Sequence, residues 1–514
     1  MSTRDRIFVT LLVIGCDWDS GDSGPESATD AETTSSTGPE TGTPTTGLEP
    51  ATSGAATEPS EATETSNPPG SSSSSSSTSE GGEDTSGGED TSGSTGAPLD
   101  CFQGSIAAFG DEVEAALISL IGYECITGNF GISNSDFSSL QALSSLRWVG
   151  GNFHINDVKL SSLAGLENLE QIGGGMYLKG LGPVTDTDAL AKLHSVGDRF
   201  AFESCNAALT SVSAPALTTV GGDLYFYNCD GLVEFSGLKG ISTVGGDVWL
   251  KHNDALSSLA GLENVTTVGG EVRIEKNDSL IDLSEFVGLA EVSGGVTITN
   301  NAALSSLGGL DALEKIGGEL VIADNPALLG LDGLDGLISA ESVRILENDE
   351  LLGLGGLDGV KVIAGDVEIF NNPAQLELDG FGALEDVGRM TIQYNEAMTS
   401  LASLSALTHA KYLLINDMPA LSSLDGLGSL ASATGISISG GDALVSVEAL
   451  VLGGGGSLAE VEDYIHVVGN LALPTCKALN IRDAFMKPPY YCYADNKFDA
   501  CSSDEDLCVP RPMP

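Results

Sequence analysis

Apolar and polar residues repeat through much of the chain with a period of 24 or 23 residues. One copy starts at Val244 and reads VGGDVWLKHNDALSSLAGLENVTT, and the next starts at Val268 with VGGEVRIEKNDSLIDLSEFVGLAE. Equivalent starts are Val196, Val220, Val292, Ile316, Ser339, Ile363 and Asp386. This repetition predicts a solenoid, because each unit buries its apolar side only by stacking on its neighbours.

Each copy carries two apolar patterns. Positions five and seven are apolar while six and eight vary, as Val248 and Leu250 show, and this period of two predicts a strand with one buried face. Leucines follow at positions 13, 16 and 19, a spacing that favours short strands and turns over a long helix. We therefore expect an all-β fold, a right-handed parallel β-helix of about 14 coils.

The position after the strand is Asn in seven consecutive coils: Asn253, Asn277, Asn301, Asn325, Asn348, Asn372 and Asn395. Asn tolerates the left-handed backbone of a sharp turn, and stacked amides can hydrogen-bond, so we interpret the row as structural rather than as a ligand site. The two preceding coils hold Cys205 and Cys229 there, with Cα atoms expected about 5 Å apart. This spacing predicts a disulfide; the alternative, a two-thiolate metal site, lacks a fourth ligand.

Composition divides the chain into five parts. Residues 1–15 are expected to be a signal peptide, 16–98 a tether, 99–125 an N-terminal cap, 126–475 the repeat solenoid and 476–514 a Cys-rich C-terminal cap. The tether consists almost entirely of Ser, Thr, Gly, Pro, Glu, Asp and Ala. Such a segment buries too little apolar surface to offset its ordering entropy, so we predict that it is disordered.

The first sixteen residues indicate export. Arg4 and Arg6 precede an apolar run, Ile7 to Ile14, and the sequence ending at Cys16 resembles a bacterial lipobox, in which the cysteine is diacylated. We predict lipidation of Cys16 and a lipid-anchored protein at the cell surface or outer membrane. The alternative is an ordinary secretory signal with a chance cysteine.

The remaining cysteines form an even set, which in an exported chain predicts disulfides. They are Cys101, Cys125, Cys205, Cys229, Cys476, Cys492, Cys501 and Cys508. Cys101 with Cys125 would tie the N-terminal cap together. At the C-terminus we prefer Cys476 with Cys492 and Cys501 with Cys508 among three pairings, beside a short helix from Lys477 to Phe485.

Residues 100–132 predict a strand, a helix from Asp111 to about Ile121, and then Cys125 before the first coil. The apolar face expected to cover the rod's end is Val113, Ala116, Leu117, Leu120 and Ile121. This order, followed by ITGNFGI and by coils with L-x-x-L-x-x-L and G-G-x-L-x-I, resembles the receptor L-domain family over roughly 101–476. The resemblance implies a sheet face that binds a ligand.

The chain departs from the receptor pattern because it has far more coils than one L domain and no intervening cysteine-rich module. The resemblance to these receptors therefore does not imply that this chain binds a hormone. Its leucine spacing is also similar to leucine-rich repeats. A leucine-rich-repeat solenoid is therefore the alternative fold, although the strand motif fits it less well.

The formal charge is −52, from 73 acidic and 21 basic residues. Such a chain cannot neutralise a row of phosphates or adhere to anionic lipid, which argues against nucleic acid and a charged membrane surface as partners. Acidic residues at 495–499 and 504–506 could suit calcium but lack the EF-hand pattern, so we interpret them as a solvated loop. We expect no metal and no cofactor.

Outward strand positions group aromatic residues on adjacent coils. They are Tyr225, Tyr227 and Trp249, with Lys251 and Arg273 beside them. Because the chain holds three Trp and ten Tyr, this clustering is typical of a contact surface for a sugar or a protein. The alternatives are that the tether or a cap covers this patch, or that it is a cross-strand aromatic ladder without a ligand.

Some parallel β-helices cleave polysaccharides, which makes an enzyme a further candidate. Position four forms an acidic column: Asp223, Asp247, Glu271, Glu319 and Asp366. Acidic residues at the same position of each repeat share one environment. A catalytic pair of carboxylates needs two different environments, one for the acid and one for the base. The histidines, His154, His194, His252, His409 and His466, fall on separate coils. We expect no enzyme activity.

These observations favour a lipid-anchored, monomeric surface protein that presents a β-helix face to an extracellular protein or glycan. Its membrane contact would be the lipid anchor alone. The alternatives are a structural spacer of the envelope without a discrete ligand and, third, a polysaccharide-active enzyme.

Overall fold

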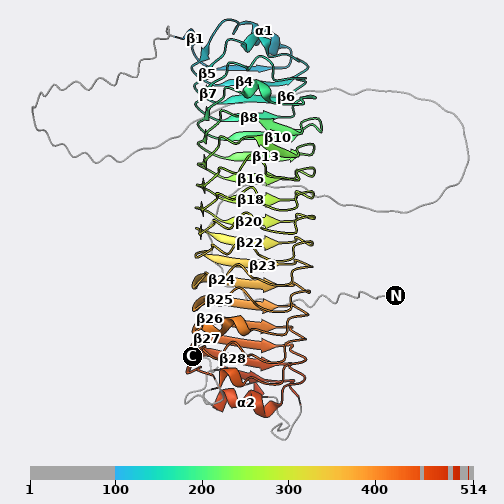
Figure 1. Ribbon diagram of the computed structural model, residues 1–514, viewed down its shortest axis with the longest axis vertical. Coiled ribbons are helices and arrows are strands. Elements are labelled where there is room, and N and C mark those ends of the chain that lie inside the picture. The colour runs from blue at the N-terminus through green and yellow to red at the C-terminus, as the bar shows by residue number, and fades with distance from the viewer. Residues whose placement is uncertain (1–98, 452–455, 484–489, 498–506, 509–514) are drawn as a thin grey trace, which may run out of the picture. The chain divides into compact units, whose positions relative to one another are not determined.

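The computed structural model describes residues 99–451, 456–483, 490–497 and 507–508. The predicted signal peptide, Cys16 and the tether lie outside these residues. The described residues belong to one unit, Gly93–Pro514, which is a column of stacked coils with helix α1 at one end and α2 at the other (Figure 1). The parallel β-solenoid predicted from the repeat is confirmed.

One long sheet runs the length of the column. Its parallel strands are β2 (Ile106–Phe109), β4 (Phe130–Ser135), β6 (Phe153–Val158), β8 (Met176–Lys179), β10 (Phe200–Cys205), β13 (Leu224–Cys229), β16 (Val248–Lys251), β18 (Val272–Glu275), β20 (Val296–Thr299), β22 (Glu319–Ala323), β23 (Ser342–Leu346), β24 (Val362–Phe370), β25 (Asp386–Gln393), β26 (His409–Asn416), β27 (Ser432–Ser439), β28 (Glu460–Val468) and β29 (Tyr490–Tyr493). Strand β30 (Leu507–Cys508) adds antiparallel to β29.

The column makes about 16 turns rather than the expected 14. Part of the difference lies in the caps, because each supplies a strand to the sheet. Strand β2 of the N-terminal cap pairs with β4, and β29 of the C-terminal cap pairs with β28. The caps therefore continue the solenoid instead of only covering it.

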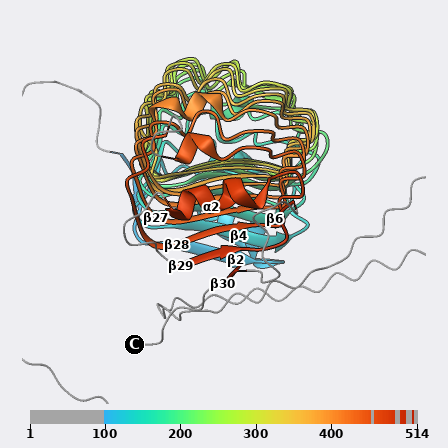
Figure 2. The same cartoon turned by 90° about the horizontal axis from the view of Figure 1, so that it is seen from below.

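Two-residue strands form a second sheet beside the first. They are β1 (Cys101–Phe102), β3 (Cys125–Ile126), β5 (Trp148–Val149), β7 (Gln171–Ile172), β9 (Ser195–Val196), β12 (Thr219–Val220), β15 (Thr243–Val244), β17 (Thr267–Val268), β19 (Glu291–Val292) and β21 (Lys315–Ile316). A third pair is β11 (Ser211–Ser213) with β14 (Glu234–Gly237). Viewed along the column, the long strands gather on one side, and loops with short helical turns form the opposite side (Figure 2).

The helical turns are η1 (Gln141–Leu143), η2 (Asp188–Leu190), η3 (Ala402–Ala406) and η4 (Glu448–Leu450). Because the strands are in register, apolar residues stack on apolar residues of the next coil, for example Leu224 on Val248. The leucines spaced by three are also buried, and Leu256, Leu259 and Leu262 are all 0% exposed. Burying each such side chain is worth about 1.5–3 kcal/mol, so the repeat itself is the hydrophobic core.

The glycines before the strands allow adjacent coils to approach closely. A Cβ placed on Gly245 would lie 2.1 Å from the carbonyl oxygen of Gly221 in the preceding coil, which a real side chain cannot do. The φ of Gly245 is not in the left-handed region. These glycines are therefore required by close approach between coils.

The asparagine row is a structural ladder, as predicted. The seven side chains are fully buried, and each amide from Asn253 to Asn372 donates to the Oδ1 of the next Asn at 3.1–3.4 Å. One detail of the prediction is wrong. The left-handed residue is the one before the Asn, such as His252 with φ 55° and Asn300 with φ 59°.

Both predicted disulfides among repeat and N-terminal residues are present, Cys101–Cys125 and Cys205–Cys229, each with Cα atoms 4.4 Å apart. Cys476 and Cys492 each take part in a disulfide, and their partners are not among the described pairs. The preferred pairing within the C-terminal cap stays a prediction, since Cys501 lies outside the described residues.

Helix α1 (Glu112–Ile118) is shorter than expected, and α2 (Thr475–Asp483) begins two residues before the predicted start. Val113, Leu117 and Leu120 are buried as predicted, but Ile121 is 63% exposed. The helix ends at Ile118, so Ile121 leaves the apolar face that the helical period assigned to it. Of the acidic segments 495–499 and 504–506, residues 498–499 and 504–506 lie outside the described residues.

Candidate binding face

The structure brings the five predicted site residues together on the outer face of the long sheet. In register, Tyr225 of β13 lies beside Trp249 of β16, which lies beside Arg273 of β18. Tyr227 lies beside Lys251 in the neighbouring row. All five side chains are half-buried. We call Tyr225, Tyr227, Trp249, Lys251 and Arg273 the aromatic face.

Its aromatic rings contact one another. The ring centroids of Tyr225 and Trp249 are 5.8 Å apart, and those of Tyr225 and Tyr227 are 6.3 Å apart. His252 meets Tyr227 edge-on at 5.5 Å. Such pairs hold each ring in place, so a ligand would meet a preformed surface.

The two cations are less available than the sequence alone indicated. Lys251 Nζ lies 2.9 Å from a carboxylate oxygen of Glu275, and Arg273 lies 2.6 Å from Glu271. The Arg273 guanidinium also lies over the Trp249 ring, 5.2 Å from its centroid. Each cation is thus neutralised locally, and the aromatic face is close to electroneutral although the whole chain carries −52.

Three further residues, which the sequence did not assign to the site, lie on the same outer side of the sheet, outside the five residues of the aromatic face. Arg199 lies 5.1 Å from the Tyr225 ring centroid and is bound by Asp223 at 2.8 Å. Tyr177 of β8 stacks on His154 of β6 with ring centroids 4.3 Å apart. The signal for Tyr177 and His154 was present, since both occupy the same outward position six as Tyr225 and Trp249.

Burial favours uncharged rings on this sheet. It raises the pKa of Tyr225, with the nearby Glu203 carboxylate adding to the effect. It also lowers the pKa of His154. The Nε1 of Trp249 is buried and has no hydrogen-bond partner among the described residues. At neutral pH these rings present apolar surface without titrating charge.

The acidic column at position four has a structural role in the coils beside the aromatic face. The Oδ1 of Asp223 accepts the backbone N–H of Asp247 at 2.9 Å, and the Oδ1 of Asp247 accepts that of Glu271 at 2.7 Å. These two carboxylates satisfy backbone donors at the corners of successive coils. Because both make the same contact, their surroundings do not mark one as an acid and the other as a base.

Two negative findings concern only the described parts of the chain. Within them, no group of three or more His, Cys, Asp or Glu side chains is placed to hold a metal ion. The helices found there are too short or too polar to cross a membrane.

No family model matches the chain, and neither does any curated protein. Among solved structures the chain is similar to one described as "Crystal structure of TLR13-ssRNA13 complex". The two share 13% identity over 76% of this chain and 83% of that chain, with a TM-score of 0.19. A similarity this distant supports no inference about a ligand, and the receptor L-domain resemblance stays a prediction.

Proposed function

We propose that the protein is a non-enzymatic binding module whose aromatic face contacts an extracellular protein or glycan. The observation that carries this proposal is the contact between Tyr225 and Trp249, whose ring centroids are 5.8 Å apart and whose side chains are both partly exposed on the sheet surface. Aromatic residues held rigidly on a flat sheet supply contact area at little entropic cost, which is why they dominate binding sites.

The charges around the rings support an uncharged or weakly charged contact. Lys251 and Arg273 are already bound by Glu275 and Glu271, so a strongly anionic ligand would have to compete with these carboxylates. A strongly cationic ligand would have to displace the arginine that lies over Trp249. Neutral sugar rings or the apolar and amide groups of a protein meet neither obstacle.

We further propose that this face is displayed outside the cell by a lipid anchor at Cys16. The disulfides support an oxidising, exported location, because such bonds rarely persist in a reducing cytosol. The basic start, the apolar run and the cysteine at residue 16 support the anchor.

The test is a screen of the purified full chain against glycans and extracellular proteins, repeated with Tyr225→Ala/Tyr227→Ala/Trp249→Ala. We expect binding to fall at least about tenfold, since each of these rings is a contact residue. The matched control is Thr297→Ala/Thr299→Ala, two residues in the same outward rows on β20. Binding that survives the triple substitution in a folded protein would refute the assignment.

A structural spacer is the second candidate, favoured by the unbroken amide ladder and a column length of about 75–80 Å at 4.8 Å per coil. A spacer predicts that neither set of substitutions changes any interaction. Shortening the column by whole coils would then alter function, whereas removing the aromatic face would not.

A further inference from the structure

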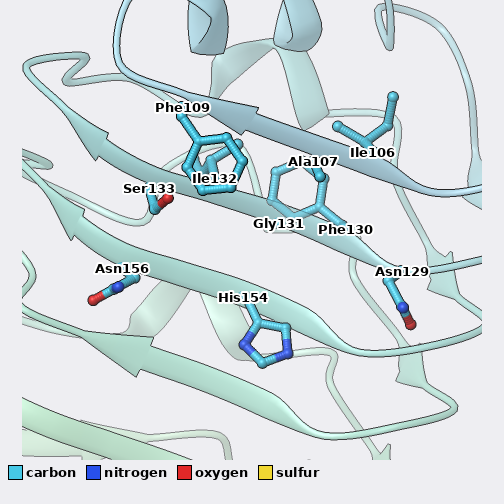
Figure 3. Close-up of a pocket in the computed structure, with 10 residues that line it drawn as sticks. All are labelled: Ile106, Ala107, Phe109, Asn129, Phe130, Gly131, Ile132, Ser133, His154 and Asn156. Carbon is cyan, nitrogen blue, oxygen red and sulfur yellow. The ribbon is translucent and has the colours of Figure 1, made fainter. Parts of the chain in front are cut away.

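A hollow lies on the outer face of the long sheet near its N-terminal end, away from the aromatic face. Its volume is about 300 Å³, and outward residues of β2, β4 and β6 frame it. In register, Ala107 lies beside Gly131 and then His154, while Phe109 lies beside Ser133 and then Asn156. Figure 3 shows these side chains around the hollow.

The floor of the hollow is open because Gly131 carries no side chain there. A Cβ on Gly131 would meet its nearest atoms at 3.8 and 3.9 Å, which is ordinary van der Waals contact, and its φ is not left-handed. Gly245, by contrast, has no room for a Cβ. A glycine inside a strand weakens it, so packing and backbone conformation do not account for Gly131.

The walls combine aromatic rings with one unsatisfied acceptor. Phe109 is 61% exposed at one rim, and His154 forms the opposite wall, held in place by its stack on Tyr177. The Oδ1 of Asn156 is buried without a hydrogen-bond partner among the described residues. A buried acceptor left unpaired is costly, so a ligand that donates a hydrogen bond to Asn156 gains from filling this site.

We propose that this hollow binds one ring of an uncharged sugar. None of its ten lining residues is an Asp, Glu, Lys or Arg, which disfavours a charged ligand. A sugar ring has an apolar C–H face that packs on Phe109 and His154, and its hydroxyl groups can donate to the Asn156 amide oxygen once that side chain turns toward the hollow. The side chain of Phe from a protein partner would fill the space but leave the Asn156 acceptor unpaired.

The volume restricts the ligand to roughly a single ring, because it is at the lower end of the range for small-molecule sites, about 300–1,000 Å³. The site is independent of the proposed function, since β2, β4 and β6 are separated from the aromatic face on β13, β16 and β18 by β8 and β10. Either surface can fail its test without the other.

The test uses the full chain with ¹³C-labelled histidine and follows the imidazole resonance of His154, assigned by its loss in His154→Gln. Methyl glucoside, methyl galactoside, methyl mannoside and N-acetylglucosamine are titrated separately. Glucuronic acid and N-acetylphenylalanine amide are the charged and aromatic comparison probes. We expect at least one neutral sugar to shift the resonance saturably, and the comparison probes to bind at least about tenfold more weakly.

Gly131→Val fills the floor and is expected to weaken sugar binding at least about tenfold while the protein melts at the same or a higher temperature. Asn156→Leu removes the hydrogen-bond acceptor and keeps the size of the side chain. If Gly131→Val lowers the melting temperature, sugar binding by Asn156→Leu is the test of the proposal. Thr297→Val is the matched control on the same outward row. The alanine-substituted aromatic face should leave this binding unchanged.

Three results would overturn the proposal. One is that no neutral sugar shifts the His154 resonance. Another is that N-acetylphenylalanine amide binds more tightly than every sugar, which would assign the hollow to a protein side chain. The third is sugar binding that persists in a folded Gly131→Val or Asn156→Leu protein.

Discussion

The backbone N–H of Cys229 donates a hydrogen bond to the Oδ1 of Asn253 over 3.1 Å. The Cys205–Cys229 disulfide therefore occupies the first two levels of the column that the asparagines continue. Ser204 and Asn228, the residues before the two cysteines, have φ of 51° and 56°, as His252 does before Asn253. Disulfide and amide are alternative ways to satisfy the same buried turn.

This equivalence predicts that asparagine can replace the disulfide. Cys205→Ala/Cys229→Ala should lose about 3 kcal/mol of stability, because the cross-link closes a short loop of the unfolded chain. Cys205→Asn/Cys229→Asn should recover part of this loss by extending the amide ladder. Thermal melting of both variants and the oxidised parent checks the order. Equal melting of the two variants would contradict the shared role of this column.

Within the ladder, Asn301→Ala should be strongly destabilising. The Oδ1 of Asn301 accepts the backbone N–H of Asn277 at 3.0 Å, and its amide donates to the carbonyl of Ile274 at 2.9 Å. Leaving such buried groups unpaired costs about 2–4 kcal/mol in total. Urea titration measures the loss, and amide hydrogen exchange at Asn277 should accelerate.

The matched control for that substitution is the neighbouring Asn300→Gly. Asn300 is exposed and has φ 59°, which glycine adopts without strain. We expect a change below about 1 kcal/mol. A comparable loss in both variants would mean that the turn geometry, rather than the buried amide, provides the stability.

Two glycine substitutions should act in opposite directions. Gly245→Ala places a Cβ 2.1 Å from the carbonyl oxygen of Gly221, so the coils must separate, at a cost of about 1–3 kcal/mol. Gly131→Ala meets no atom closer than 3.8 Å and should stabilise the strand by about 0.5–1 kcal/mol. Melting temperatures should fall for the first and rise for the second. A fall in both would show that Gly131 too is needed for packing.

Stability should decrease as the pH falls below about 7, through partly buried histidines. Burial lowers the pKa of His154, His252 and His466 in the folded protein. The unfolded chain, with a histidine pKa of about 6.5, then binds protons more readily. The stabilisation is complete above that value and is lost as the pH falls through the folded pKa.

Melting curves across this pH range measure the effect. His154→Gln should make the decline shallower, because one of the three contributing groups no longer titrates. The control is His194→Gln, since His194 is exposed. A decline unchanged by His154→Gln would assign the pH dependence to other groups.

Much of the fold is predictable because the repeat translates one local pattern into one position in space. Alternating apolar residues such as Val248 and Leu250 define a strand, and a spacing of 24 residues places Cys205 on Cys229. The grouping of Tyr225 with Trp249 follows from the same repeat spacing. The need for glycine at position 245 could not be predicted from the repeat, because it arises from the close approach of a carbonyl oxygen in the preceding coil.

The sequence by itself determined the period, the buried positions, the amide column and the repeat disulfide, since each depends only on like residues stacking on like. Tertiary structure alone decided that Lys251 is neutralised by Glu275, that the caps add strands to the sheet, and that Gly131 opens a hollow between Phe109 and His154. These features depend on side-chain reach and on the register of the atypical first coils. No repeated pattern encodes such contacts between unlike residues.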